Sequence, residues 1–144
     1  MSFLLDTNVV SELRRAKTGE ADANVVAFAA ALDPAALFLF VVTVLELGRG
    51  VLLAERRDGA QGASLRRWLE DQVLPAFDGR GLPVDAAVAR RCAVLHVPDP
   101  RCARDALIAA TALVVGPAVV TRNVADFEAT GARLVNPWKS DRCG

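Results

Sequence analysis

Short apolar segments that alternate with helical segments constrain the fold of this chain more than any other feature. The segments expected to form strands are rich in Val, Leu and Phe and lie at residues 3–5, 37–42, 118–121 and 133–135, with a shorter one at Val84. Apolar spacing and Gly or Pro breaks predict helices at residues 8–15, 21–31, 43–57, 65–75, 86–95 and 102–115, with a loop at 58–62. Strands separated by helices predict an α/β fold, in which a short parallel sheet is flanked by helices on both faces.

The length of the chain, 144 residues, predicts a single domain over residues 1–144 that is long enough to bury a sizeable core. Its 17 basic and 17 acidic residues give a formal net charge of zero. Proteins that bind nucleic acid non-specifically over a whole surface are strongly basic, so the composition excludes that class. Any nucleic-acid partner would have to be held by a local patch of positive charge.

The three cysteines, Cys92, Cys102 and Cys143, form no CxxC pair, and their odd number argues against a disulfide framework or a zinc ribbon. Cys92 and His96 stand four residues apart on an expected helix. They could pack in the core or share a soft metal, for which two side chains are too few ligands. The cysteines fit a reducing cytosol, and the start of the chain lacks the pattern of a signal peptide. Since the apolar segment 37–42 is too short to span a membrane, we expect a cytoplasmic protein without membrane association.

Acidic residues in apolar surroundings suggest a metal site. They are Asp6, Glu46, Asp105 and Asp126. Asp6 follows the first apolar segment, and open α/β sheets place their ligand sites at the carboxyl ends of strands. Two carboxylates about 4 Å apart repel by about 4 kcal/mol at an effective dielectric constant of about 20, so a converging set needs a cation or raised pKa values. Ligands that are all oxygen select Mg²⁺ or Mn²⁺ over zinc.

Each acid also has an explanation as part of a helix start. Asp6 could cap the helix that follows it. Glu46 and Thr43 have the spacing of a capping box, in which the glutamate reaches back to the first amide of the helix. Asp105 near a helix N-terminus would be favoured by about 0.3–1 kcal/mol. Asn123 could cap a short helix that carries the last acid.

If the acids converge, the metal that they hold would polarise a phosphate, lower the pKa of an attacking water and stabilise the leaving oxygen. The residues alone therefore predict a Mg²⁺-dependent site for phosphoryl transfer. They do not identify a substrate.

Four segments of the chain carry a family resemblance in their order and spacing. They are Leu4–Glu12, Thr43–Gly50, Asp105–Ala112 and Val120–Phe127, the last followed by Asn136–Trp138. Together they resemble the PIN-domain ribonucleases, specifically the VapC-type toxins of type II toxin–antitoxin systems and their FitB-like subgroup. The resemblance covers nearly the whole chain. It implies a PIN-like fold with the acids gathered at one end of the sheet, and hydrolysis of RNA phosphodiester bonds with Mg²⁺ or Mn²⁺.

By this resemblance Asp6, Glu46 and Asp105 are the core catalytic and metal-binding acids. Many relatives carry an aspartate where this chain has Asn123, so either Asn123 or Asp126 fills the fourth acidic position, and the number of metal ions depends on which does. The residues expected beside the metal or its ligands are Thr7, Thr121 and Asn123.

The resemblance also implies partners for the protein. It implies an RNA substrate, a homodimer, and a small cognate antitoxin whose tail crosses the active-site groove and whose N-terminal part binds operator DNA. Residues 47–53 and 65–73 are the expected antitoxin-facing segments, with ordinary core packing as the alternative. The arginines expected to supply phosphate contacts are Arg14, Arg15, Arg49, Arg101 and Arg104.

Two other functions fit parts of the same pattern. An aspartyl phosphatase or phosphotransferase would use Asp6 as its nucleophile, but the sequence Asp6-Thr7-Asn8 lacks the second aspartate that such sites use as an acid and base. A catalytically silent binding module would keep the acids only to engage a partner, and the single feature that favours it is Asn123.

Overall fold

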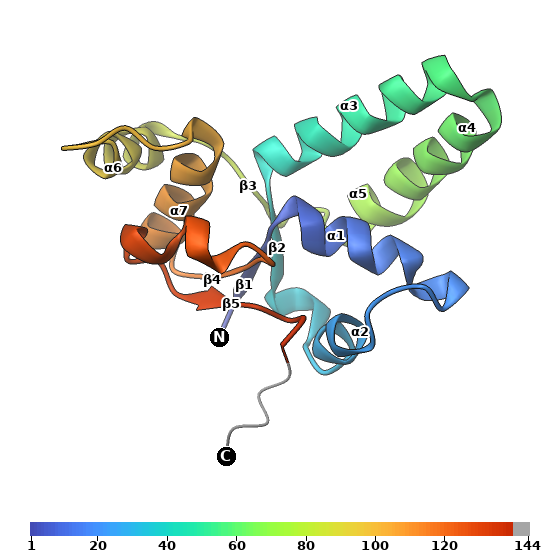
Figure 1. Cartoon of the computed structure of the whole chain (residues 1–144), viewed down its shortest axis with the longest axis horizontal. Helices are drawn as coiled ribbons and strands as arrows, with labels where there is room; N and C mark the ends of the chain where they lie inside the picture. Colours follow the sequence, from blue (N-terminus) through green and yellow to red (C-terminus); the bar gives the residue numbers. More distant parts are fainter. Residues whose placement is uncertain (140–144) are drawn as a thin grey trace.

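The computed structural model describes residues 1–139, and its centre is a five-stranded sheet in which every pair of neighbouring strands is parallel (Figure 1). The strand order is β3-β2-β1-β4-β5. The strands are β1 (Phe3–Leu5), β2 (Leu37–Phe40), β3 (Gly81–Leu82), β4 (Ala118–Val120) and β5 (Leu134–Val135). Strands β1 and β4 are buried along their whole length, which is why they form uninterrupted apolar segments in the sequence.

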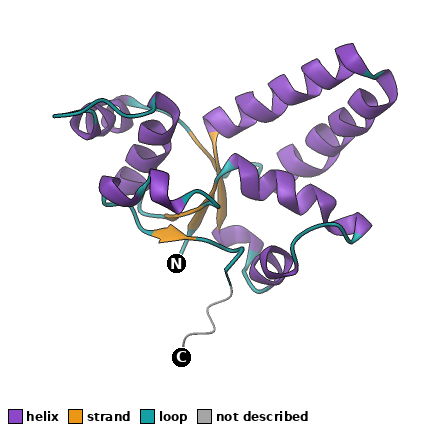
Figure 2. Ribbon diagram, viewed as in Figure 1, coloured by secondary structure: helices purple, strands orange, loops and turns teal. Residues whose placement is uncertain are grey.

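Helices cover both faces of the sheet (Figure 2). They are α1 (Thr7–Arg14), α2 (Ala23–Ala30), α3 (Val41–Arg57), α4 (Gly59–Trp68), α5 (Leu74–Ala76), α6 (Ala86–Leu95) and α7 (Ala103–Val115). Side chains of β1 alternate between the faces, so Phe3 and Leu5 pack in one apolar cluster with α1, α2 and α3. Leu4 points to the other face and packs with α6 and α7. The expected α/β fold, with a short parallel sheet between two layers of helices, is confirmed.

The carboxyl ends of the three central strands lead directly into the segments that carry the predicted site. Strand β1 is followed by Asp6, β2 by helix α3, and β4 by Thr121. Leu5 pairs with Leu39 on one side and with Val120 on the other, so the three strands end nearly level. Residues that follow these strands therefore meet at one edge of the sheet.

The loop expected at residues 58–62 is wrong. Only Asp58 separates α3 from α4, because its side chain accepts hydrogen bonds from the backbone N–H groups of Ala60 (3.0 Å) and Gln61 (3.3 Å) and so begins α4 at Gly59. The helix expected to begin at residue 65 is already in its second turn there. Helix α4 passes through a π-helical turn, Leu69–Val73, into α5.

Four strand boundaries also need correction, and two of them shift by a single residue: β4 ends at Val120 rather than at residue 121, and β5 begins at Leu134 rather than at residue 133. The strand expected at Val84 lies at Gly81–Leu82 instead, because Leu82 pairs in parallel with Phe40 of β2. Strand β2 ends at Phe40 rather than at residue 42, since Val41 begins α3. Within residues 1–139, no helix is both long and apolar enough to cross a membrane.

Helices α3 and α4 pack as a hairpin whose contact depends on Gly62. A Cβ atom at Gly62 would lie 2.4 Å from the Cα atom of Glu55, and that atom belongs to the backbone of the facing helix. Beside this contact, Arg66 binds Glu55 with two hydrogen bonds of 2.7 Å, one to each carboxylate oxygen. A side chain at position 62 would force the two helices apart.

We expect Gly62→Ala to lower the free energy of unfolding by about 1–3 kcal/mol, the usual cost of overpacking. Gly50→Ala is the matched control, since Gly50 lies in α3 and a Cβ there would have no neighbour within 4 Å. The control should stabilise the protein by about 0.5–1 kcal/mol, because alanine favours a helix. Urea unfolding curves measure both changes. A Gly62→Ala variant as stable as Gly50→Ala would contradict the close approach.

Candidate active site

Asp6 lies at the end of β1 and is held there by several hydrogen bonds. The residue is only 2% exposed. Its Oδ1 atom accepts a hydrogen bond from the backbone N–H of Thr7 (2.8 Å), and its Oδ2 atom accepts one from the Thr121 hydroxyl (2.8 Å). The first of these bonds makes Asp6 the N-cap of α1, so the capping role and a position in the site coexist. A buried carboxylate with this many donors has a fixed orientation.

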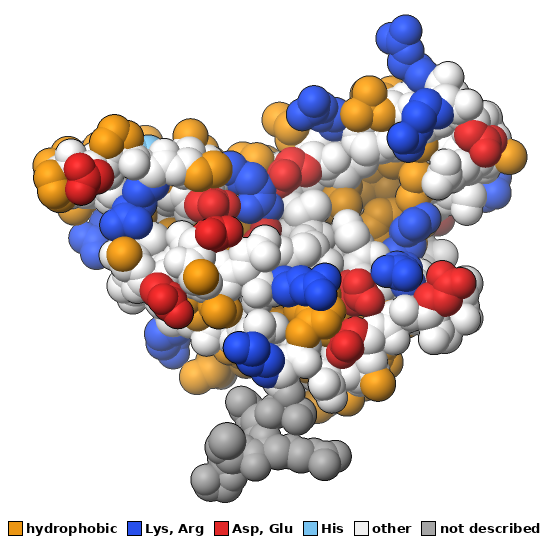
Figure 3. Space-filling view, viewed as in Figure 1, with side chains coloured by type: hydrophobic (Ala, Val, Ile, Leu, Met, Phe, Trp, Pro, Cys, Tyr) orange, Lys and Arg blue, Asp and Glu red, His pale blue; other side chains and the backbone are white. Residues whose placement is uncertain are grey.

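The guanidinium of Arg104 bridges three of the predicted acids. Its Nη2 atom donates to Asp6 Oδ1, its Nε atom donates to Glu46 Oε1 (2.7 Å), and its Nη1 atom donates to Asp105 Oδ1 (3.2 Å). The acids come from three elements: the end of β1, the second turn of α3 and the first turn of α7. Figure 3 shows acidic and basic side chains side by side in the hollow between the α3–α4 hairpin and the α6–α7 layer. The structure therefore brings Asp6, Glu46 and Asp105 together around one cation.

The carboxylates of Asp6 and Glu46 stabilise the charged form of the Arg104 guanidinium. Partial burial lowers the pKa of the Arg104 guanidinium, but hydrogen bonds and charge attraction from Asp6 and Glu46 outweigh that effect and raise the pKa above its ordinary value. Arg104 is thus positively charged at neutral pH. It compensates part of the repulsion among the three acids.

Thr7 connects the acids on the side of the site formed by α3. Its hydroxyl lies 2.9 Å from Glu46 Oε1 and 3.1 Å from the Thr43 hydroxyl, and Arg104 Nη2 donates to it (3.0 Å). A hydroxyl has one proton, and a carboxylate can only accept, so Thr7 donates to Glu46 and accepts from the other two. The capping-box interpretation of Thr43 and Glu46 is wrong, because α3 begins at Val41 and Glu46 faces the site.

Asn8 and Thr121 complete the opposite side. The Asn8 amide lies 3.4 Å from the Thr121 hydroxyl and 3.5 Å from Asp6 Oδ2, and its oxygen accepts the backbone N–H of Arg122 (3.3 Å). The backbone N–H of Asn123 donates to the Thr121 hydroxyl (3.1 Å). The predicted residues Thr7 and Thr121 thus lie beside the acids. Asn8, Thr43 and the central place of Arg104 were missed.

Asp126 lies outside the cluster around Arg104. It is exposed, in a single helical turn, and it lines a depression of about 290 Å³ together with Asp105 and Arg101. Its backbone N–H donates to the carbonyl of Asn123 (3.1 Å), so Asn123 begins this turn as expected, although its side chain makes no capping bond. Among residues 1–139, no three His, Cys, Asp or Glu side chains are grouped as ligands around one point. The convergence of four acids is therefore not seen, and three of them meet at Arg104.

Cys92 has a structural role. It is buried on α6 against α7, and burial raises the pKa of its thiol, which disfavours the thiolate that binds metals. His96 accepts a hydrogen bond from the backbone N–H of Arg101 through Nδ1 (3.1 Å). Core packing accounts for Cys92, and the hydrogen bond from the Arg101 backbone accounts for His96. Cys143 lies outside the described residues.

The donor atoms around Arg104 fit a hard divalent cation. The three carboxylates and the neighbouring hydroxyls of Thr7 and Thr121 offer oxygen ligands, which Mg²⁺ and Mn²⁺ prefer. Cys and His side chains, which zinc prefers, are not among the groups that contact Arg104 in the described part of the chain. The chemistry of the site therefore agrees with the expected metal, provided that Arg104 gives up its place.

Comparison with known proteins identifies the family. The family model of the PIN domain matches residues 3–132 of the chain. The chain belongs to the PIN-domain family. Its PIN domain thus spans all three acids that meet at Arg104 and all five strands except the last, Leu134–Val135.

Individual relatives place this PIN domain near bacterial toxins. It is 39% identical to the VapC ribonuclease Y4jK of Sinorhizobium fredii, over 95% of this chain and 98% of the relative. It is 38% identical to Toxin FitB of Neisseria gonorrhoeae, over 94% of this chain and 98% of the relative. The expected relationship to VapC-type and FitB-like PIN domains is confirmed.

Solved structures agree with the fold. The crystal structure of FitAcB from Neisseria gonorrhoeae superposes with a TM-score of 0.87 at 36% identity and covers 96% of this chain and 99% of that one. The structure of FitAB bound to a DNA fragment superposes with a TM-score of 0.86 at 33% identity and covers 99% of each chain. These matches confirm the expected PIN-like arrangement of sheet and helices.

Proposed function

We propose that this protein is a metal-dependent ribonuclease toxin that hydrolyses RNA phosphodiester bonds and is neutralised by a cognate antitoxin. One observation carries the proposal: Asp6, Glu46 and Asp105 meet at the carboxyl edge of a PIN-domain sheet. The names of the VapC and FitB relatives support a nuclease toxin, and FitAcB and FitAB support an antitoxin partner. RNA as the substrate and the metal requirement are the finer parts of the proposal.

The residues that would hold Mg²⁺ or Mn²⁺ are Asp6, Glu46 and Asp105. When bound, such an ion lowers the pKa of a water and stabilises the leaving oxygen of a phosphodiester. Thr121 and the Thr7 backbone fix the Asp6 carboxylate, and the Thr7 hydroxyl fixes Glu46, so the acids keep their positions while charge develops on the phosphate.

Asp126 and Asn123 remain the proposed candidates for the fourth acidic position. Asp126 shares a depression with Asp105, so a second ion or a water could be held between them. Asn123 is exposed next to Thr121 and adds an oxygen ligand without charge. Because Asn123 is uncharged, its side of the site carries less negative charge than a fourth aspartate would give, which favours one firmly held ion over two.

RNA would reach the acids through the hollow between α3 and α7. Arg49 stands on α3 three residues after Glu46, and Arg101 stands three residues before Arg104; both are exposed. Guanidinium groups at these places suit the two phosphates that flank a scissile bond. Such local contacts agree with a chain whose total charge is zero.

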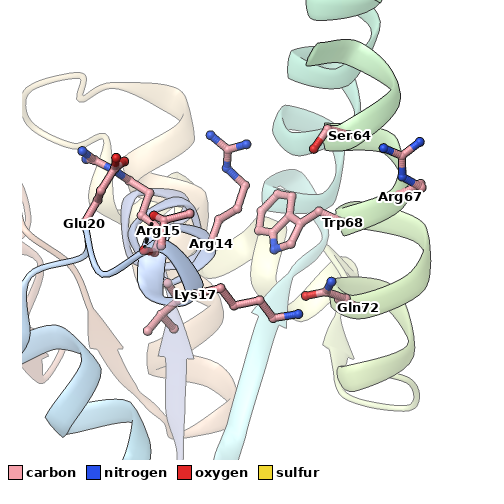
Figure 4. Close-up of a pocket in the computed structure, with 10 residues that line it drawn as sticks. Arg14, Arg15, Lys17, Glu20, Ser64, Arg67, Trp68 and Gln72 are labelled. Atoms are coloured by element: carbon pink, nitrogen blue, oxygen red, sulfur yellow. Dashed lines mark hydrogen bonds between the residues drawn. The ribbon is translucent and has the colours of Figure 1, made fainter. Parts of the chain in front are cut away.

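A groove between α1 and α4 is the proposed antitoxin site. Its apolar part, about 260 Å³, is lined by Leu13, Trp68 and Phe77 among others, and it continues into a basic part of about 390 Å³. Figure 4 shows the Trp68 indole between the two helices with Arg14 beside it, and the Arg14 guanidinium lies 5.8 Å from the ring centroid. The basic side chains that line the groove are Arg14, Arg15, Lys17 and Arg67. A partner segment with apolar anchors and acidic neighbours fits this surface.

The two expected antitoxin-facing segments differ in exposure. Residues 65–73 supply Trp68 and Val73 to the groove. In residues 47–53, Leu47 and Val51 are buried in the core and only Leu52 and Leu53 are exposed among the leucines and valines. The proposal therefore places the antitoxin on residues 65–73.

We further propose a cytoplasmic homodimer that contacts operator DNA only through the antitoxin. Val41, Leu45 and Leu52 are exposed on one face of α3, at spacings of four and seven residues, and offer an apolar surface to a second copy. The FitAB structure bound to DNA supports the role of the antitoxin complex in DNA binding.

The antitoxin site is tested by Trp68→Ala. We expect the Kd for the cognate antitoxin to rise about 30-fold, which corresponds to about 2 kcal/mol for a tryptophan anchor, while RNA cleavage by the antitoxin-free protein persists. The measurement is inhibition of cleavage by added antitoxin. Trp138→Ala is the matched control, since Trp138 carries Arg122 over its ring (5.2 Å) but lies outside the groove. Equal inhibition of Trp68→Ala and Trp138→Ala would contradict this site.

A further inference from the structure

Arg104 binds one oxygen of each acid that the proposed function assigns to the metal. The oxygens are Asp6 Oδ1, Glu46 Oε1 and Asp105 Oδ1, and each is approached by a different nitrogen of the guanidinium. The Arg104 side chain is 26% exposed, so its guanidinium is not enclosed by the protein. Among the described residues, no other cationic side chain lies within 4 Å of these three carboxylates.

The Asp6 carboxylate has little capacity for a further ligand while Arg104 is in place. Oδ1 accepts from Arg104 and from the Thr7 backbone, and Oδ2 accepts from Thr121 with Asn8 nearby. A carboxylate offers about four lone-pair sites, and a bound Mg²⁺ stands about 2.0–2.1 Å from its oxygen ligands. An ion so close to Asp6 Oδ1 would need the place that Arg104 Nη2 holds.

We propose that Arg104 is a positioning residue that competes with the divalent ion for these carboxylates, so that metal binding displaces its guanidinium. This inference rests on the proposed metal-dependent function. In the metal-free protein, Arg104 reduces the repulsion among the acids and keeps them within reach of one another. Metal binding and the Arg104 contacts then oppose each other, and the affinity for metal is set by their difference.

The competition predicts that removing Arg104 tightens metal binding. Hydrogen bonds between charged groups contribute enough that their loss should lower the Kd for Mn²⁺ about 10–100-fold in Arg104→Gln. Arg104→Lys keeps the charge but loses the planar fork that reaches three carboxylates at once. Its Kd for Mn²⁺ should therefore lie between that of wild type and that of Arg104→Gln. A scaffold that merely holds the acids would give the reverse order, since its loss would weaken metal binding.

Mn²⁺ titration followed by calorimetry and electron paramagnetic resonance tests the inference on the purified chain. The variants are Arg104→Gln, Arg104→Lys and the control Arg49→Gln, which removes an exposed charge from α3 near Glu46 without touching the cluster. We also expect metal-free Arg104→Gln to melt at a lower temperature than metal-free wild type. Mn²⁺ should then raise the melting temperature of Arg104→Gln more than that of Arg49→Gln.

Tighter Mn²⁺ binding by Arg104→Gln than by Arg49→Gln supports the competition. If Arg104→Gln binds Mn²⁺ no more tightly than Arg49→Gln does, and wild type still binds Mn²⁺, the competition is overturned and the metal-dependent function stays intact. If neither wild type nor any variant binds Mn²⁺, the metal-dependent function fails, and the competition fails with it.

Discussion

We expect Asp6→Asn to lower the rate of RNA cleavage at least about a thousandfold. A metal ion stabilises the charge of a phosphoryl transition state by several kcal/mol, and each 1.4 kcal/mol or so corresponds to a factor of ten in rate. Asp6 is the most buried of the three acids and the one whose two oxygens are both held, by Thr7 and Thr121. The substitution removes the charge, and the new amide nitrogen cannot accept either of those hydrogen bonds.

The measurement is single-turnover cleavage of a labelled single-stranded RNA by protein freed of antitoxin. Asp78→Asn is the matched control, because it makes the same change at an exposed position that precedes β3, at the opposite edge of the sheet from the site. Glu46→Gln provides a second test, since Glu46 is partly exposed and its loss should disturb folding less than that of Asp6. Melting curves verify that each variant is folded. Cleavage by folded Asp6→Asn at the wild-type rate would remove Asp6 from the mechanism.

We expect chelation to have an effect of similar size. Dialysis against EDTA should abolish RNA cleavage, and Mg²⁺ or Mn²⁺ should restore it, because the acids that surround Arg104 provide oxygen ligands suited to hard cations. Zn²⁺ should restore less, since the contacts of Arg104 in the described chain include no Cys or His. Restoration by Zn²⁺ alone would contradict the assigned ligands.

The sequence was sufficient to predict strands β1 and β4 because both are buried along their whole length. Uninterrupted apolar segments such as Phe3–Leu5 and Ala118–Val120 have few other uses in a chain with this many helices. The boundary between α3 and α4 was missed since Asp58-Gly59-Ala60 resembles a turn, whereas Asp58 acts as a cap and Gly62 permits close helix packing. Such packing depends on a residue of another helix, Glu55, and no local pattern reveals it.

The three acids of the site could be predicted, and the cation between them could not. Asp6, Glu46 and Asp105 follow strand ends or begin helices, so the topology of a parallel sheet brings them to one edge. Arg104 is next to Asp105 in the chain, and its sequence position suggested a phosphate contact. Its bridging role depends on where α3 and β1 place the other two carboxylates, which only the folded structure defines. Asp126 was placed in the set by its apolar surroundings and by the family resemblance, and the structure leaves it at an exposed turn.

The most direct test of the metal-dependent function is a Mg²⁺ titration of RNA cleavage by wild type and Asp6→Asn side by side. Both proteins are first freed of antitoxin and treated with EDTA, and the initial rate is measured on the same labelled RNA. The account predicts no cleavage without metal, a saturable rise for wild type, and a flat line for Asp6→Asn. Cleavage without metal, or titration curves that coincide for the two proteins, would contradict it.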